Sequence, residues 1–209
     1  MTTIVIPAYN EERTVGKVVA SCRKYGTVIV VNDASTDRTE SSAKKAGAIV
    51  VSHKINRGLG AALRTGFSLA LKMKSGIIIT IDADGQHCPQ EIPIFIEKIK
   101  EGYDFVIGQR DLSKYPLAKK IGNFFLNRAT NFIAGTKLND TESGFRAFSG
   151  EALKKLKLRA ERYEIAAEIV KQAGKNRLKS ANVQITIPVY IKGVSVLDGI
   201  KNFIYIVRN

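Results

Sequence analysis

The stretch Ile77–His87, IIITIDADGQH, joins a buried strand to a polar turn. Its first five residues are apolar or β-branched, and Asp82, Asp84 and Gln86 follow at alternate positions. Such continuous runs are typical of strands that are buried on both faces of a sheet. In doubly wound sheets, ligands bind beyond the carboxyl ends of the strands. The stretch therefore predicts an α/β sheet that is covered on both faces, with a ligand site at the edge formed by the carboxyl ends of its strands.

The sequence around this stretch alternates between strand and helix patterns. Val28–Asn32 is a second near-continuous Val/Ile run. We predict strands at Thr3–Ile6, Val28–Asn32, Ile49–Ser52, Ile77–Ile81 and Phe105–Ile107. We predict helices at Glu11–Tyr25, Asp37–Gly47, Gly58–Lys74 and Gln90–Glu101. Alternation at this spacing indicates a mainly parallel sheet with helices on both faces, because parallel neighbours need a crossover between them.

The pattern becomes irregular after about residue 110. We predict helices at Leu117–Ala134, Glu151–Lys157 and Arg162–Ala173, strands at Phe145–Phe148 and Val183–Ile191, and a short apolar helix or strand at Val196–Val207. The sequence shows no repeat, linker or low-complexity tract. We therefore expect one domain, 1–209, with a regular α/β half (1–109) and a basic half (110–209).

The composition is that of a globular protein with an unusual charge. Hydrophobic residues make up 44% and charged residues 25%, which excludes disordered, collagen-like and coiled-coil proteins. The net charge is +14, and residues 110–209 hold 19 Lys and Arg against 8 Asp and Glu. This surplus indicates an anionic partner (nucleic acid, a phosphate-bearing substrate or an acidic membrane) or merely a solubilising surface.

The sequence also points to a reducing compartment. The two cysteines, Cys22 and Cys88, exclude a disulfide framework. We find no signal-peptide pattern, and no run reaches the ~18 apolar residues of a membrane span. These observations predict a cytoplasmic protein.

Three polar turns are expected at one edge of the sheet. Asp82, Asp84 and Gln86 offer closely spaced oxygen ligands, which suit Mg²⁺ or Mn²⁺ bound together with phosphates. Asp33 follows the second strand and could accept hydrogen bonds from a ribose or a base. The turn Pro7–Glu12 adds an aromatic face and a carboxylate. Together the turns make a nucleotide pocket plausible.

Other motifs point to ordinary structure. Gly58–Leu63 resembles a dinucleotide fingerprint, but the third glycine is missing and five residues separate the glycine turn from the strand. His87 could join Asp84 in a metal site, but we interpret it as a loop histidine in solvent. Both cysteines are interpreted as ordinary thiols because neither has a metal or redox spacing.

Six motifs occur in order along the chain: IVIPAYNEE, VNDASTD, NRGLGAALRTG, DADGQH, GQR and DTESGFRAF. Together they resemble the inverting family 2 glycosyltransferases, and within them the dolichyl-phosphate mannose synthase and polyprenyl-phosphate glycosyltransferase group. The resemblance runs from about residue 3 to residue 191. It implies a GT-A fold, with a Rossmann-like nucleotide half and an acceptor half.

The resemblance also implies roles for individual residues. It assigns nucleotide-sugar binding to Pro7, Tyr9, Glu11, Val31, Asp33, Asp82, Ala83, Asp84, Arg110 and Lys192. It assigns Mg²⁺ or Mn²⁺ to Asp82, Asp84 and Gln86, and catalysis to Asp84 and Arg110. The acceptor side would contain Ser143 and Arg146 of the SGFR signature, and we add Lys119 and Lys120 from the basic helix. Glu168 matches a recurring family glutamate or forms a structural salt bridge.

The chain departs from the family pattern near its end. The synthases carry an arginine and then a Gly-x-Ser-Lys phosphate-binding turn, whereas this chain has Lys192 and places Val196 at the lysine position. Related enzymes continue into transmembrane helices. We expect this chain to sit peripherally on the cytoplasmic face of an anionic membrane, through its basic half and the apolar residues Phe203–Ile206.

The implied reaction moves a sugar, mannose or glucose, from a nucleotide diphosphate sugar to a polyprenyl or dolichyl phosphate with inversion. A phosphate acceptor needs no general base, whereas a hydroxyl acceptor on a glycan or small molecule would need a carboxylate. Asp111, Asp140 and Glu142 are the candidates for that alternative. A non-catalytic nucleotide-sugar or nucleic-acid binding protein is a further alternative, but no nucleic-acid motif is present.

Overall fold

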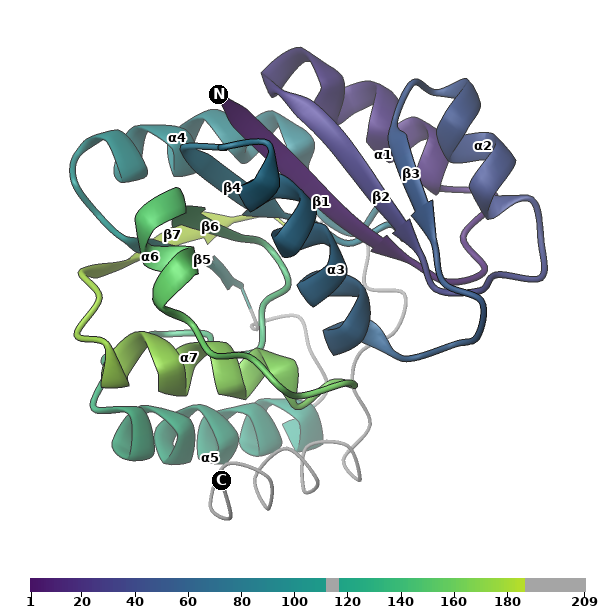
Figure 1. Cartoon of the computed structure of the whole chain (residues 1–209). Helices are drawn as coiled ribbons and strands as arrows, with labels where there is room; N and C mark the ends of the chain where they lie inside the picture. Colours follow the sequence, from purple (N-terminus) through teal and green to yellow (C-terminus); the bar gives the residue numbers. More distant parts are fainter. Residues whose placement is uncertain (112–116, 187–209) are drawn as a thin grey trace.

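Seven strands form one sheet in the order β3-β2-β1-β4-β6-β5-β7. The computed structural model describes residues 1–111 and 117–186, with side chains in the second range from Lys120 onward. The strands are β1 (Thr2–Ala8), β2 (Thr27–Asn32), β3 (Ile49–Ser52), β4 (Ile77–Thr80), β5 (Phe105–Arg110), β6 (Arg146–Ser149) and β7 (Ser180–Ile185). Figure 1 shows the sheet in the middle of the molecule with helices on both faces.

The helices form two layers around the sheet. Their bounds are α1 (Val15–Cys22), η1 (Arg23–Tyr25), α2 (Thr39–Lys45), α3 (Leu59–Lys72), η2 (Pro89–Glu91), α4 (Ile92–Lys100), α5 (Leu117–Ala134), α6 (Gly150–Lys155) and α7 (Ile165–Lys175). One core cluster contains side chains of α1, α2 and α4, and the other contains side chains of α3, α6 and α7. Helix α5 packs on α7, on the side away from the sheet (Figure 1).

Side chains of the central strands alternate between the two layers. In β1, Ile4 and Ile6 belong to the first cluster and Val5 to the second, and all three are fully buried. Because both faces are covered, the strand shows no polar alternation, as the sequence predicted.

The sheet is parallel except at β6. Strands β3, β2, β1 and β4 are parallel neighbours, whereas β6 runs antiparallel between β4 and β5, and β7 is parallel to β5. Thr80, the last residue of β4, faces Arg146, the first residue of β6. The insertion of β6 therefore brings the residues that precede it to the edge where the parallel strands end.

Most predicted elements are confirmed, with shifts at their ends. Helix α1 begins at Val15 rather than Glu11, and in the turn before it the main-chain N–H groups of Glu11 and Glu12 donate to the side chains of Thr39 and Asp37. Strand β7 begins at Ser180, three residues before the predicted Val183, and the predicted residues 187–191 lie outside the described residues. The predicted element at Val196–Val207 lies outside the described residues.

Candidate active site at the carboxyl edge of the sheet

The sheet brings the predicted polar turns to one edge. Asp33 directly follows β2, and Asp82 comes two residues after β4. Arg110 ends β5 and Arg146 begins the antiparallel β6 at the same edge. The acidic turns of the first half thus lie beside the arginines of the second half.

The turn after β1 is joined to the turn after β2. The side-chain oxygen of Asn10 accepts from the N–H of Thr36 at 2.9 Å, and the N–H of Asn10 donates to Ser35 at 2.9 Å. Asn10 and Ala34 both have positive φ, a conformation found at tight, functional turns. The Tyr9 ring beside them is 48% exposed. It is therefore available to stack on a flat ligand such as a base.

Asp33 is buried and bonded within the protein. Its carboxylate accepts from the N–H groups of Arg57 (2.9 Å) and Gly58 (2.7 Å), and from Nδ1 of His53 at 2.7 Å. Nε2 of His53 lies 2.9 Å from the hydroxyl of Thr65. In this structure Asp33 holds the loop before α3, and its contact with a ribose or base stays a prediction.

Asp82 lies between a buried histidine and a glycine. Nε2 of His87 donates to Oδ2 of Asp82 at 3.0 Å, and the His87 ring lies 5.5 Å from that of Phe145. A Cβ atom at Gly144 would lie 2.6 Å from each carboxylate oxygen of Asp82. His87 is 6% exposed, so its interpretation as a loop histidine in solvent is wrong. Its contact depends on how the turn folds back, which residue spacing does not show.

The surroundings of Asp82 keep its carboxylate ionised. Burial would raise its pKa, but the hydrogen bond and charge of His87 and the charges of Arg110 and Arg146 lower the pKa below the ordinary 3.8. Arg110 ends β5 at the edge where Asp82 follows β4, so its positive charge acts on the Asp82 carboxylate. The sequence predicted this from the shared edge.

Asp84 is oriented by its own turn. Its Oδ1 accepts from the N–H of Gln86 at 2.9 Å, and its Oδ2 accepts from the Gln86 side-chain amide. Gln86 thus presents its amide nitrogen to Asp84 and orients that carboxylate. Direct ligation of a metal by Gln86 stays a prediction.

The donor set fits a divalent cation that is shared with a ligand. Two carboxylates, Asp82 and Asp84, come from one turn, and no group of three or more His, Cys, Asp or Glu side chains suitable for a metal occurs within the described ranges. Mg²⁺ commonly uses only one or two carboxylates and takes its other ligands from phosphates and water. The residues therefore suit Mg²⁺ or Mn²⁺ bound together with a diphosphate.

Glu11 adds to the acidic side of the site. Burial raises its pKa above the ordinary 4.5, a hydrogen bond from Thr14 lowers it, and the charges of Asp84, Asp37 and Asp82 raise it further, leaving the pKa raised overall. A carboxylate that is repelled by its neighbours favours a bound cation.

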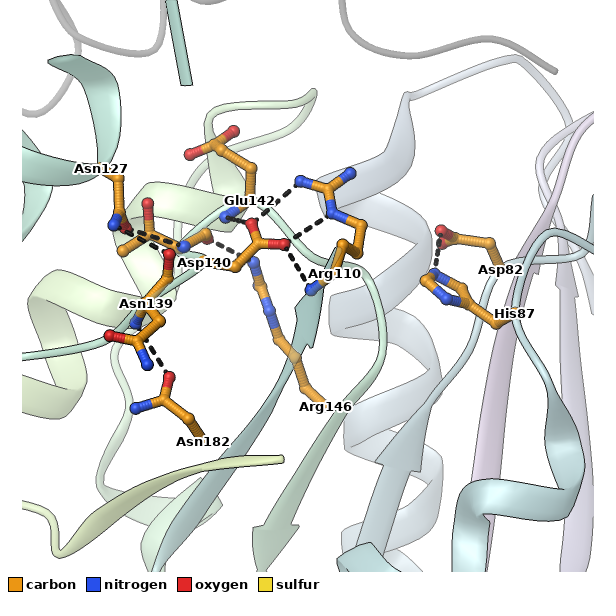
Figure 2. A network of polar contacts seen from close by, with 10 residues as sticks. Asp82, His87, Arg110, Asn127, Asn139, Asp140, Glu142, Arg146 and Asn182 are labelled. Atoms are coloured by element: carbon orange, nitrogen blue, oxygen red, sulfur yellow. Dashed lines mark hydrogen bonds and ion pairs between the residues drawn. The ribbon is translucent and has the colours of Figure 1, made fainter. Parts of the chain in front are cut away.

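Arg110 is held by a buried carboxylate. Its Nε and Nη2 donate to the two oxygens of Asp140 at 2.6 and 2.9 Å, and its main-chain N–H donates at 3.2 Å (Figure 2). The Asp140 side chain is only 5% exposed. Asp140 was a candidate base in the sequence, but both its oxygens accept from Arg110. Sequence reasoning named Asp140 as a candidate base but did not identify it as the partner of Arg110.

The predicted acceptor residues Ser143 and Arg146 are buried. Ser143 has no exposed surface, and Arg146 donates from Nη2 to the carbonyl of Thr141 at 3.0 Å. Burial lowers the pKa of Arg146 to about 10, against the opposing charges of Glu142, Asp140 and Asp82. In this structure these two side chains are buried beside the site, and their direct contact with an acceptor stays a prediction.

Of the other predicted site residues, some are described by the structure and some lie outside it. Val31 and Ala83 point into the two core clusters, so only their main chain can face a nucleotide. Lys120 is half-buried on α5. The side chain of Lys119, and all of Lys192, lie outside what the structure describes.

The carboxylate of Glu168 binds main chain. It accepts from the N–H groups of Arg159 (2.9 and 3.0 Å) and Ala160 (2.9 Å). The carbonyl of Glu161 then accepts from Ala61, and a Cβ at Gly60 would lie 2.3 Å from the carbonyl of Ala160. The glycines of NRGLG therefore serve close packing of α3 against this segment, not a dinucleotide.

Glu168→Ala is expected to lower the free energy of unfolding by about 1–3 kcal/mol, because it leaves buried N–H groups without a partner. Thermal or urea unfolding measures the loss. Glu164→Ala is the control, since Glu164 begins the same helix and makes no side-chain capping bond. Equal stability of the two variants would contradict this role.

Comparison with known proteins shows two similar relatives. The chain is 43% identical to an uncharacterised protein of Methanocaldococcus jannaschii, over 95% of this chain and 87% of that protein. It is 35% identical to UDP-N-acetylglucosamine–dolichyl-phosphate N-acetylglucosaminyltransferase of Methanococcus voltae, over 96% of this chain and 92% of that enzyme.

Solved structures of glucosyl-3-phosphoglycerate synthase from Mycobacterium tuberculosis share the fold. The structure with phosphoglyceric acid has a TM-score of 0.79 at 23% identity, covering 99% of this chain and 79% of that one. Other structures of the same enzyme contain UDP with Mn²⁺ or Mg²⁺. The predicted GT-A fold is thus confirmed. The glycosyl transferase family 2 model matches residues 3–157, and the chain belongs to that family of glycosyltransferases.

Proposed function

We propose that this enzyme transfers a sugar from a nucleotide diphosphate sugar to a polyprenyl or dolichyl phosphate, with inversion at the anomeric carbon. The donor would bind mainly to residues 1–109 and the acceptor to residues 110–209. The relative from M. voltae supports a lipid phosphate acceptor and adds N-acetylglucosamine to mannose and glucose as candidate sugars.

The proposal rests on the nearness of carboxylates and an arginine at the carboxyl edge of the sheet. Asp82 and Asp84 form an acidic turn, and Arg110 lies close enough for its charge to lower the pKa of Asp82. Figure 2 shows Arg110 on the side of Asp140 that faces the Asp82–His87 pair. A site with this polarity suits a divalent cation beside phosphate groups.

Each side chain then has a definite task on the donor. Asp82 and Asp84 would hold Mg²⁺ or Mn²⁺, which when bound neutralises the charge that builds up on the leaving diphosphate. Gln86 and His87 orient these two carboxylates. The exposed ring of Tyr9 would stack on the base.

The acceptor side favours a phosphate nucleophile. A phosphate is already an anion near neutral pH and needs no base, while a hydroxyl would need a carboxylate within reach. Both oxygens of Asp140 accept hydrogen bonds from Arg110. Asp140 is therefore poorly placed to remove a proton, which weakens one of the three candidate bases of the hydroxyl alternative and leaves Asp111 and Glu142.

A donor and acceptor screen tests the proposal. The purified chain is incubated with UDP-N-acetylglucosamine, GDP-mannose or UDP-glucose and a polyprenyl phosphate, with Mn²⁺ or with a chelator, and products are identified by mass. A sugar-phosphate lipid formed only with the metal is expected. Products formed only on the hydroxyl of an added glycan or small molecule, and not on the polyprenyl phosphate, would favour the alternative.

The structure also suggests where a membrane would be contacted. Within the described residues no helix has the length and apolar character needed to cross a bilayer. Helix α5 exposes Ile121, Phe125, Arg128 and Phe132, which share one face at helical spacing, with Phe124 beside them. Phe132 is 88% exposed. An exposed apolar helix face that also carries a basic residue suits the surface of an anionic membrane.

Replacing Phe125 and Phe132 together by Ser is expected to lower vesicle binding tenfold or more, because each buried phenyl contributes roughly 1.5–3 kcal/mol. Co-sedimentation with anionic vesicles measures binding, and it should also weaken with salt. Ile55→Ser is the control, since Ile55 is 70% exposed on the loop before α3. Undiminished binding by the double variant, or equal binding to neutral vesicles, would contradict the prediction.

A further inference from the structure

The loop between α5 and β6 is bound along its main chain by one side of α5. Nδ2 of Asn127 donates to the carbonyls of Leu138 (3.2 Å) and Asn139 (3.0 Å), and its Oδ1 accepts from the N–H of Thr141 at 3.1 Å. Asn131 adds bonds to both the N–H and the carbonyl of Leu138 at 2.9 and 2.7 Å. The main chain is therefore fixed on each side of residue 140.

Asp140, between these fixed points, is the residue that holds Arg110. It accepts three hydrogen bonds from Arg110, two of them from the guanidinium. The neighbouring Asn139 is bound from the sheet side, because its N–H donates to Asn182 at 2.9 Å and its Nδ2 donates to Gln109 at 2.7 Å. Figure 2 shows this network from Asn127 to Arg110.

We propose that Asp140 and Asn127 are positioning residues for Arg110. Asp140 fixes the direction of the guanidinium, and Asn127 fixes the main chain that carries Asp140. The proposal rests on the proposed function in one respect, namely that Arg110 faces a phosphate of donor or acceptor.

The physical reason lies in the freedom of an arginine side chain. An arginine has many rotamers, and holding it in one of them costs entropy. A planar guanidinium that meets a carboxylate through two parallel hydrogen bonds has a defined plane and direction. Because Asp140 already holds Arg110, the guanidinium would be ordered before a phosphate binds. The entropy cost of ordering it would then not reduce the stabilisation of the transition state.

The first test observes Arg110 itself and needs no turnover. In protein labelled with ¹⁵Nε-arginine, the Nε–H of Arg110 should give a slowly exchanging resonance, assigned by its loss in Arg110→Lys. Asn127→Ala and Asp140→Asn are expected to shift this resonance and speed its exchange. In Asn176→Ala it should stay unchanged, since Asn176 also binds main chain, at Gln172, but at the end of α7. An unchanged resonance in Asn127→Ala would overturn the proposal.

The second test is a double-mutant cycle on transfer. Asn127→Ala alone should lower kcat/KM about tenfold, and Asp140→Asn by ten- to a hundredfold. In an Arg110→Lys background, Asn127→Ala should change kcat/KM by less than about threefold, because the group it positions is gone. A merely destabilising substitution would lower kcat/KM by the same factor in both backgrounds, and that result would also overturn the proposal.

The two tests separate this inference from the proposed function. If the wild-type chain transfers no sugar to a lipid phosphate, the proposed function fails while the resonance of Arg110 still reports its positioning. If Asp140→Asn fails to fold, Asn127→Ala provides both measurements, since it keeps the side chains of both Asp140 and Arg110.

Discussion

Asp84→Ala is expected to abolish turnover, lowering kcat by about a thousandfold or more. Asp84 is the carboxylate that its own turn orients, through both the main chain and the side chain of Gln86. Without it, a cation beside the leaving diphosphate would lose a charged ligand, and such stabilisation amounts to several kcal/mol of the barrier. The initial rate of sugar transfer with Mn²⁺ measures the effect.

Two further variants and an excess of chelator make this test specific for a cation at the turn. Glu97→Ala removes an exposed acidic residue from α4 and should leave the rate unchanged. Asp84→Asn keeps an oxygen for the Gln86 N–H but loses the charge, so it should lose turnover while keeping the unfolding temperature. Full activity in excess chelator, or in Asp84→Ala, would show that no cation acts at this turn.

Gly144→Ala is expected to have the next largest effect, lowering both stability and donor binding. The added Cβ would lie 2.6 Å from both oxygens of Asp82 and 2.9 Å from its Cγ. Turning the carboxylate away would cost its hydrogen bond with His87. Overpacking of this kind costs about 1–3 kcal/mol of stability, and a displaced Asp82 should weaken nucleotide diphosphate binding roughly tenfold to a hundredfold.

Calorimetric titration of UDP or GDP with Mn²⁺, together with thermal unfolding, measures both effects. Gly16→Ala is the matched control, because the nearest atom to a Cβ there is the carbonyl oxygen of Ser42 at 3.7 Å. Wild-type affinity in Gly144→Ala would mean that the loop before β6 shifts without disturbing Asp82, and that Asp82 does not depend on this contact.

The parallel half of the fold and its acidic turns were predictable because their signals are local. A strand buried on both faces has a continuous apolar run, and a ligand turn in such a fold comes directly after it. Val28–Asn32 and Ile77–Ile81 therefore located β2 and β4, and Asp33, Asp82 and Asp84 followed from them. The motif order then indicated the family, which the family model confirms.

The arrangement of the second half followed less completely from sequence. Strand β6 has four residues, and nothing in them shows that it runs antiparallel between β4 and β5. Strand β7 begins three residues before its predicted start, because residues 180–182 pair with β5 although they show no apolar alternation of their own. Short strands carry too few residues for their direction or register to be determined locally.

By itself, the sequence determined the chemistry available to this protein: an acidic turn after a buried strand, an arginine at a strand end and a surplus of positive charge in the second half. Only the tertiary structure decided how these groups are held. The contacts of Asp82 with His87 and Gly144, and of Arg110 with Asp140, join residues between 5 and 62 positions apart. Direction and burial of a side chain depend on which elements pack around it, and that packing is set by the whole sheet rather than by neighbours in the chain.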